Sequence, residues 1–189
     1  MNNSTFKSIL IAIGMSFCII SAASAQKYST KNGRISFFSE TAAEKIEAQN
    51  TQVNSALDIT TGDFVFKTLI RGFEFEKALM QEHFNENYLE SDKYPNSTFR
   101  GKVTNLKDIN FTKDGKYNAT VEGDLLIHGV TKKVSVKGTF EIKAGSVFAD
   151  SKFTILIKDY GVKIPNTVIN SISESLEIKV SVELKKLIN

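Results

Sequence analysis

An alternation of apolar and polar residues runs through the centre of the chain. Between Thr98 and Thr104, every second residue counted from Phe99 is apolar or glycine, and the residues between them are polar. The segments 117–127 and 134–142 repeat this alternation. Successive side chains of a β-strand point to opposite faces of its sheet, so the pattern predicts three consecutive strands that share one apolar face.

The same pattern predicts strands on both sides of this block. Their ranges are 34–40, 45–48, 53–59, 63–71, 147–157 and 176–184, and the Asn32-Gly33 dipeptide is expected to form a turn before the first of them. Between Glu76 and Tyr88 the period changes to that of a short helix, with Leu79, Met80, Phe84 and Tyr88 on one side. The prediction is an all-β domain of eight or nine antiparallel strands with one short helical insertion.

A sheet of this size with one apolar face buries that face in a sandwich or by closing into a barrel. Gly101, Gly123 and Gly138 occupy the apolar phase of neighbouring strands. A glycine at such a position gives up core packing, which fits a place where the strand bends or where space is left inside the sheet. We therefore favour a barrel whose apolar face points inward.

The alternation in each strand also identifies the side chains that are expected to face the interior. Those expected to line it and to contact a ligand are Phe64, Phe66, Phe99, Val121, Leu125, Val136, Phe140, Phe153, Ile155 and Val180. Two interpretations stay open, because the same side chains either surround an open lumen or fill the barrel completely. The apolar side of the helical insertion is in the same way either a lid over one end or a plug that completes the core.

The first 25 residues have the features of a secretory signal peptide: Lys7, an apolar run from Ile9 to Ile20, and small residues at positions 23–25. The predicted mature domain is 26–189, beginning at Gln26, and we expect it to be exported. A retained membrane anchor is the alternative, but the apolar run is shorter than the roughly 20 residues that span a bilayer. Cys18, the single cysteine, is interpreted as part of the apolar run.

Charge and side-chain chemistry narrow the classes of function. The formal net charge is only +3 and the lysines are dispersed, so nucleic acid is not an expected partner. His128 stands before Gly129 in a hairpin, and we interpret it as a residue that shapes the turn. His83 has no second histidine at zinc-binding spacing, and no Gly-x-Ser-x-Gly motif occurs. No catalytic residue, metal ligand or cofactor is predicted.

Two motifs resemble those of a known family. The run Tyr94-Pro95-Asn96-Ser97-Thr98-Phe99 and the run from Val121 to Lys132, which contains Leu125-Leu126-Ile127-His128-Gly129-Val130-Thr131-Lys132, are similar to the YceI-like lipid-binding proteins. Leu126 stands where the family usually has Thr, and Lys133 where it usually has Pro. The early Asp-x-x-His-Ser pattern of the family is replaced by residues 31–36.

The resemblance implies an eight-stranded antiparallel lipocalin-like barrel, exported to the periplasm, that holds a long-chain isoprenoid or similar acyl lipid in its lumen and carries out no catalysis. A ligand-free structural or partner-binding barrel and an unrecognised enzyme are the alternatives. An outer-membrane barrel alternates as regularly with its apolar face outward. The chain has no Trp to form interfacial girdles and distributes its Phe within strands, so stable membrane insertion is not expected. The sequence makes no prediction of oligomeric state.

Overall fold

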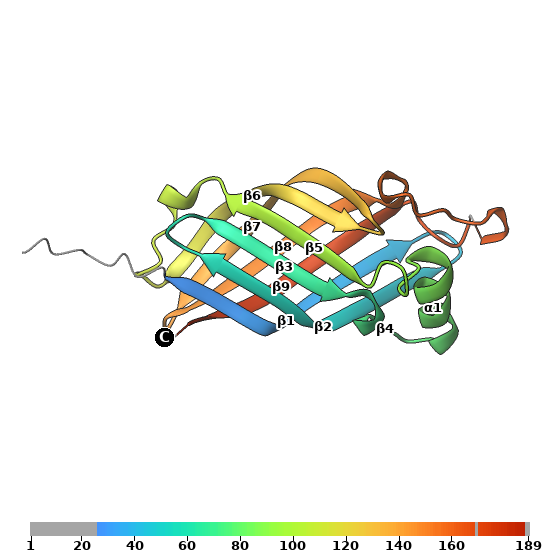
Figure 1. The fold of residues 1–189 in the computed structure, drawn as a ribbon, viewed down its shortest axis with the longest axis horizontal. Coiled ribbons are helices and arrows are strands. Elements are labelled where there is room, and N and C mark those ends of the chain that lie inside the picture. The colour runs from blue at the N-terminus through green and yellow to red at the C-terminus, as the bar shows by residue number, and fades with distance from the viewer. Residues whose placement is uncertain (1–25, 169, 188–189) are drawn as a thin grey trace, which may run out of the picture.

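Eight long strands close into an antiparallel barrel in the computed structural model, which describes residues 26–168 and 170–187 (Figure 1). The strands are β1 (Lys27–Glu40), β2 (Lys45–Asp58), β3 (Asp63–Leu69), β5 (Asn96–Val103), β6 (Gly115–Ile127), β7 (Val130–Lys143), β8 (Ser146–Leu156) and β9 (Ser175–Lys186). Their order around the wall is β1-β9-β8-β7-β6-β5-β3-β2, and β1 also pairs with β2. That last pairing closes the sheet, which confirms the predicted barrel.

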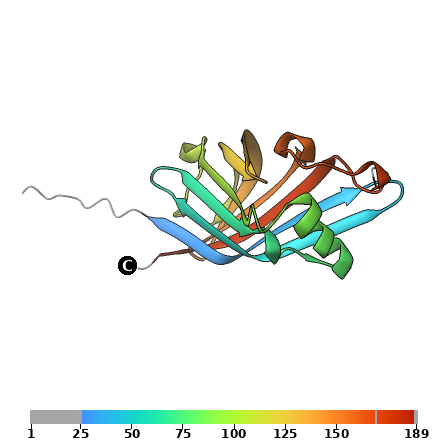
Figure 2. The same ribbon diagram turned by 45° about the vertical axis from the view of Figure 1, so that its right-hand side comes forward.

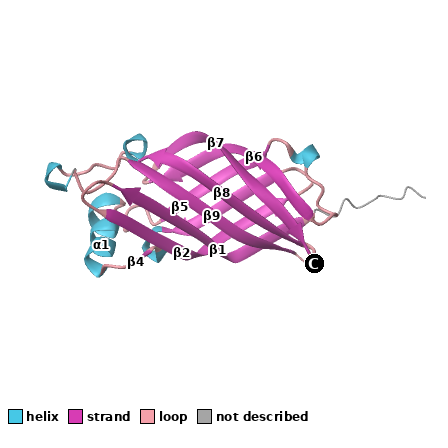
Figure 3. Ribbon diagram, turned by 180° about the vertical axis from the view of Figure 1, so that it is seen from behind, coloured by secondary structure: helices cyan, strands magenta, loops and turns pink. Residues whose placement is uncertain are grey.

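Short helices and one two-residue strand connect the long strands. The two-residue strand pairs with β2, and Figure 3 shows the helices confined to the two ends of the barrel. They are η1 (Ile70–Gly72), β4 (Glu74–Phe75), α1 (Ala78–His83), the π-helical turn η2 (Phe84–Tyr88), η3 (Leu106–Asp108), η4 (Ile157–Tyr160) and η5 (Asn166–Val168). Within the described ranges, no helix has the length and apolar character needed to cross a membrane.

Several predicted element boundaries are wrong. The Asn32-Gly33 dipeptide lies inside β1 and not before it, because the pairing of β1 with β2 shifts register on both sides of Gly33. The two segments predicted around residues 45–59 are one strand, β2, whose polar residues 49–52 hide its continuity. β3 ends at Leu69 and continues into η1. The predicted helix 76–88 is divided into α1 and η2.

The apolar phase of the strands faces the interior, as predicted. Gly101 lies opposite Gly123 on β5 and β6, and a Cβ atom on either would collide with backbone atoms of the neighbouring strand. Gly138 is similarly close to the carbonyl oxygen of Asp150. These glycines therefore permit close backbone approach where the sheet curves.

The two ends of the barrel differ. One end carries Gln26, Leu187 and the β2–β3 and β7–β8 turns. Its interior is filled with side chains, and Leu57, Val147 and Leu184 there are 0% exposed. The opposite end carries the β1–β2 turn, the helical insertion and the β8–β9 connection (Figures 1 and 2). The barrel interior is therefore filled at one end, and any space for a ligand must lie toward the other.

The ladder between β7 and β8 covers only part of their lengths. Pairs run from Lys143↔Ser146 to Gly138↔Ser151 and then stop, whereas β8 continues to pair with β9 through Leu156. β7 likewise continues to pair with β6 through Val130. The wall is therefore interrupted between the first half of β7 and the last part of β8.

Candidate ligand-binding site

A cavity of about 370 Å³ occupies the barrel on the side of the helical insertion. All ten side chains expected to line the interior lie around it: Phe64, Phe66, Phe99, Val121, Leu125, Val136, Phe140, Phe153, Ile155 and Val180. The volume falls in the range of ordinary small-molecule sites. Their contact with a ligand remains a prediction, but the structure brings the set together around one space.

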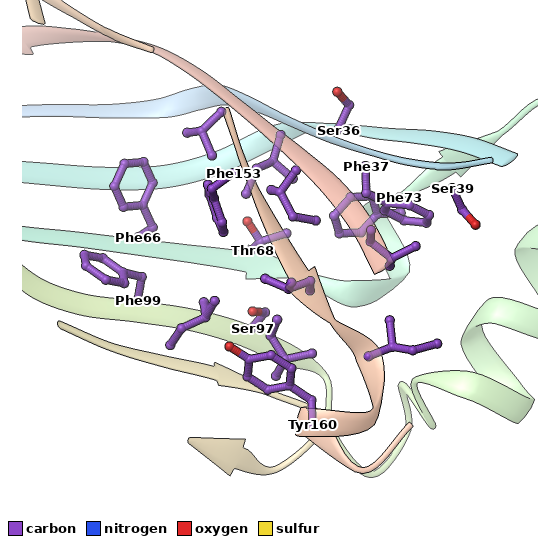
Figure 4. A pocket seen from close by; sticks show the side chains of 18 of the residues that line it. Ser36, Phe37, Ser39, Phe66, Thr68, Phe73, Ser97, Phe99, Phe153 and Tyr160 are labelled. Carbon is purple, nitrogen blue, oxygen red and sulfur yellow. The ribbon is translucent and has the colours of Figure 1, made fainter. Parts of the chain in front are cut away.

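Aromatic rings form the floor of this cavity. The ring centroids of Phe64 and Phe66 lie 4.5 Å apart, and Phe64 meets Phe140 edge-on at 5.6 Å. Phe66 continues toward Phe99 at 6.3 Å (Figure 4). Ala119 and Ala149 are buried in the same cluster as Phe64 and Phe140 and also line the cavity.

Polar groups around the cavity are few and mostly hydroxyls. The Ser97 hydroxyl donates to the carbonyl of Leu126 at 2.8 Å, and the Ser39 hydroxyl accepts from the backbone N–H of Ser173 at 3.0 Å. Thr68 and Tyr160 also extend into the space (Figure 4). Burial, and to a smaller degree the Asp159 charge, raises the pKa of Tyr160, so its phenol stays protonated at neutral pH.

The charged lining residues are Glu44, which lies at the β1–β2 turn, and Asp150, on the outer phase of β8. No charged side chain of the described chain thus lines the depth of the cavity. A site of this kind holds an apolar body and leaves a charged group at its margin, because burying an unpaired charge costs several kcal/mol.

The helical insertion covers one side of the open end. Phe84 packs against three rings at centroid distances of 5.0–5.6 Å: Phe37 on β1, Phe73, and Phe75 on β4. The Lys77 ammonium contacts the Glu44 carboxylate at 3.1 Å and ties the insertion to the β1–β2 turn. No residue of α1 is buried.

Three of the four residues expected on the apolar side of the insertion line the cavity: Met80, Phe84 and Tyr88. Leu79 does not, and it is 61% exposed. Successive residues of an α-helix are about 100° apart around its axis, so Met80 and Phe84, four residues apart, share a face that Leu79 does not. Grouping Leu79 with them was therefore wrong.

Tyr94 of the first sequence motif and His128-Gly129 of the second meet outside the cavity, whereas strand residues of both motifs line it. His128 and Gly129 both have positive φ, and a Cβ on Gly129 would lie 2.5 Å from the Tyr94 ring. The rings of Tyr94 and His128 contact each other at 4.7 Å. The His128 ring contacts the Glu90 carboxylate through Nε2 at 2.7 Å and the Tyr160 carbonyl through Nδ1 at 3.2 Å. The motif residues therefore fix the β6–β7 hairpin, which is the role interpreted for His128.

Metal-ligating side chains do not cluster in the part of the chain that the structure describes. No group of three or more His, Cys, Asp or Glu side chains there could hold a metal ion. His83 is exposed at the rim, and the His128 ring is already engaged by Glu90 and Tyr160.

Part of the lining lies outside the predicted strands. Tyr160 follows the predicted strand 147–157, and Phe73 and Phe75 lie in a connection without periodicity. Phe37 was placed on a strand without its inward role, although its alternation with Ile35 carried that signal. Tertiary packing at the end of the barrel, which leaves no periodic trace in the sequence, brings these residues to the cavity.

The fold and the cavity define a class: closed antiparallel barrels with an apolar interior open toward one end. The model of the YceI-like domain matches residues 16–184, and the chain belongs to this family. A UPF0312 protein of Pseudomonas putida is 31% identical over 103 residues, which cover 51% of this chain and 48% of the relative. The chain spans about half the length of the curated relatives it matches.

Solved structures share the fold at low sequence identity. A polyisoprenoid-binding domain from Saccharophagus degradans, described as implicated in plant cell wall breakdown, superposes with a TM-score of 0.75 at 11% identity, covering 86% of this chain and 99% of that one. BcnA of Burkholderia cenocepacia gives a TM-score of 0.62 at 15% identity, with 80% and 95% covered. These likenesses establish the barrel.

Proposed function

We propose that this protein is an exported, non-enzymatic binding protein that holds the tail of a long-chain isoprenoid or similar acyl lipid in the cavity of its barrel. The observation that carries the proposal is the cavity itself, about 370 Å³ in volume and lined mainly by aromatic and branched aliphatic side chains. Membership of the YceI-like family and the polyisoprenoid-binding description of one structural neighbour support it.

The energetics favour a hydrocarbon ligand. Each buried CH₂ group contributes about 0.8 kcal/mol, so one five-carbon isoprene unit contributes about 4 kcal/mol. Three such units, about 12 kcal/mol, are of the size needed to offset the cost of association and still give useful affinity. The contribution needs shape and an apolar lining, which accounts for a site without a sharp polar motif.

Export to the periplasm is part of the proposal and rests on the sequence of residues 1–25, which lie outside the described residues. Amino-terminal sequencing of the protein from the producing cell tests it, with Gln26 as the expected first residue. A first residue before Ser24 would contradict the signal-peptide interpretation.

A matched pair of substitutions on β6 tests the binding site. Leu125 is 9% exposed and faces the cavity, whereas Leu126 lies on the opposite phase of the same strand. Leu125→Lys should abolish binding of a fluorescent geranylgeranyl probe, because the ammonium would lie within the apolar lining. Leu126→Lys should leave binding within about twofold of wild type, less than 0.5 kcal/mol. Equal binding by both variants would contradict the proposed site.

A further inference from the structure

The interruption between β7 and β8 is bounded on all sides. Its margins are Val130–Lys137 of β7 and Lys152–Leu156 of β8. At one end the Ser151 hydroxyl donates to the Lys137 carbonyl at 2.8 Å. At the other, the His128 ring is bonded to the carbonyl of Tyr160, which ends η4. The gap is thus a window with fixed ends.

Apolar side chains of both margins cover this window on the cavity side, where Val130, Val134 and Phe153 pack against the cluster of Leu125, Ile155 and Tyr160. Val134 and Val136 on one margin, and Phe153 and Ile155 on the other, line the interior. Thr139 and Asp150, which belong to the outer phase at the lower end of the window, line the same cavity. A shallow outer depression shares Gly138 and Ser151 with it. The cavity and the outer depression therefore share wall residues where the ladder stops.

Lysines gather at the point where the ladder ends. If the register continued past Gly138↔Ser151, the next pair would be Lys137 with Lys152. Lys152 already lies directly opposite Lys179 on β9, and both share the carboxylate of Glu177 at 2.7 and 3.5 Å. Like charges directly opposite each other on neighbouring strands are destabilising, so closing this part of the wall would add a third cation to the row.

We propose that the window between β7 and β8 is the lateral entrance for the lipid tail, and that Lys137, Lys152 and Lys179 at its lower corner hold an anionic head group outside the barrel. This rests on the proposed function and names its ligand class: a lipid with one apolar chain and a phosphate or carboxylate head. The three lysines line the outer depression together. A head group there would contact this row of cations from outside, while the tail passes between Val136 and Phe153.

A covalent staple across the window tests the entrance. In the continued register Ser135 of β7 would lie opposite Thr154 of β8, and both are on the outer phase. Ser135→Cys with Thr154→Cys, in a Cys18→Ser background, is joined with a short bis-maleimide. The matched control joins Ser135→Cys to Glu122→Cys, which are already paired across β6 and β7. Exchange of a fluorescent geranylgeranyl phosphate is measured before and after each reaction.

The window staple should slow probe exchange at least about tenfold, equivalent to 1.4 kcal/mol in the barrier, and the control staple should leave it unchanged. Equal exchange rates in the two stapled proteins would overturn the lateral entrance. If the unstapled parent binds no prenyl probe at all, the proposed function itself fails, which is a separate outcome.

Charge substitution tests the head-group contact. Lys137→Gln with Lys152→Gln should weaken the binding of geranylgeranyl phosphate by about tenfold, because each exposed ion pair contributes up to about 1 kcal/mol. The binding of geranylgeraniol, which carries no charge, should be unaffected. If any anionic head group suffices, the double variant should also weaken the binding of palmitate. Lys116→Gln, at the packed end of β6, is the control. Equal losses for the charged and the neutral lipid would overturn the lysine contact.

Discussion

Filling the cavity from its wall should shorten the lipid chain that the protein accepts. Val121 lies on β6, lines the cavity and is only partly buried, so a larger side chain there occupies empty space. Val121→Phe adds four carbon atoms, close to one isoprene unit. At about 0.8 kcal/mol per carbon the ligand loses about 3 kcal/mol of burial, or about two orders of magnitude in affinity for the longest chain that fits.

The assay is a titration of wild type and variant with a series of prenyl probes that differ by one isoprene unit. Affinity should rise with the length of the prenyl chain in both proteins. In the variant, affinity should stop rising at a chain one isoprene unit shorter than in wild type. Thermal stability should stay equal or increase, because the new ring fills space that is otherwise empty. Val121→Ile is the control and should retain the wild-type plateau. A variant with unchanged affinity for every chain length would refute the assignment of the cavity as the tail site.

Three further predictions follow from the rim, the window and the interior. Met80→Ala with Phe84→Ala should accelerate probe exchange more than it lowers Tm if the insertion is a lid; a large loss of Tm with unchanged exchange identifies a plug. Val136→Lys should abolish lipid retention yet destabilise the fold less than Leu125→Lys, because the lysine can extend through the window to water; equal Tm losses would contradict this geometry. Burial raises the pKa of Tyr160, so its stabilising contribution is present below the unfolded-state pKa, about 10, and is lost as pH rises through the folded value. Tyr160→Phe should therefore flatten the fall of Tm above pH about 10, and an unchanged pH profile would rule out this contribution.

The strand alternation predicted the inner face of the long strands, and the glycines on that face favoured a barrel over a sandwich. Phe64, Phe99, Val121 and Phe153 could be placed correctly because a period of two fixes which side chains share a face. The boundaries of the strands and helices were harder to predict from the sequence, because the β1–β2 bulge at Gly33 and the change from α1 to η2 depend on tertiary contacts.

Whether the lumen is open or filled could not be read from the sequence, and the structure contains both conditions. Leu57 and Leu184 belong to a packed end, whereas Val136 and Phe153 border open space, although all four occupy the same apolar phase. Periodicity assigns a face to each residue but does not report how many neighbours reach it. The window is equally hidden, since Lys137 and Lys152 become neighbours only when β7 and β8 are aligned.

Native mass spectrometry of the protein, purified under mild conditions from the cell that produces it, tests the central claim most directly. We predict a species heavier than the polypeptide by the mass of one isoprenoid or acyl lipid, released on gentle activation and absent from Leu125→Lys. A homogeneous ligand-free mass for the wild-type protein, together with no uptake of added prenyl phosphate, would contradict it.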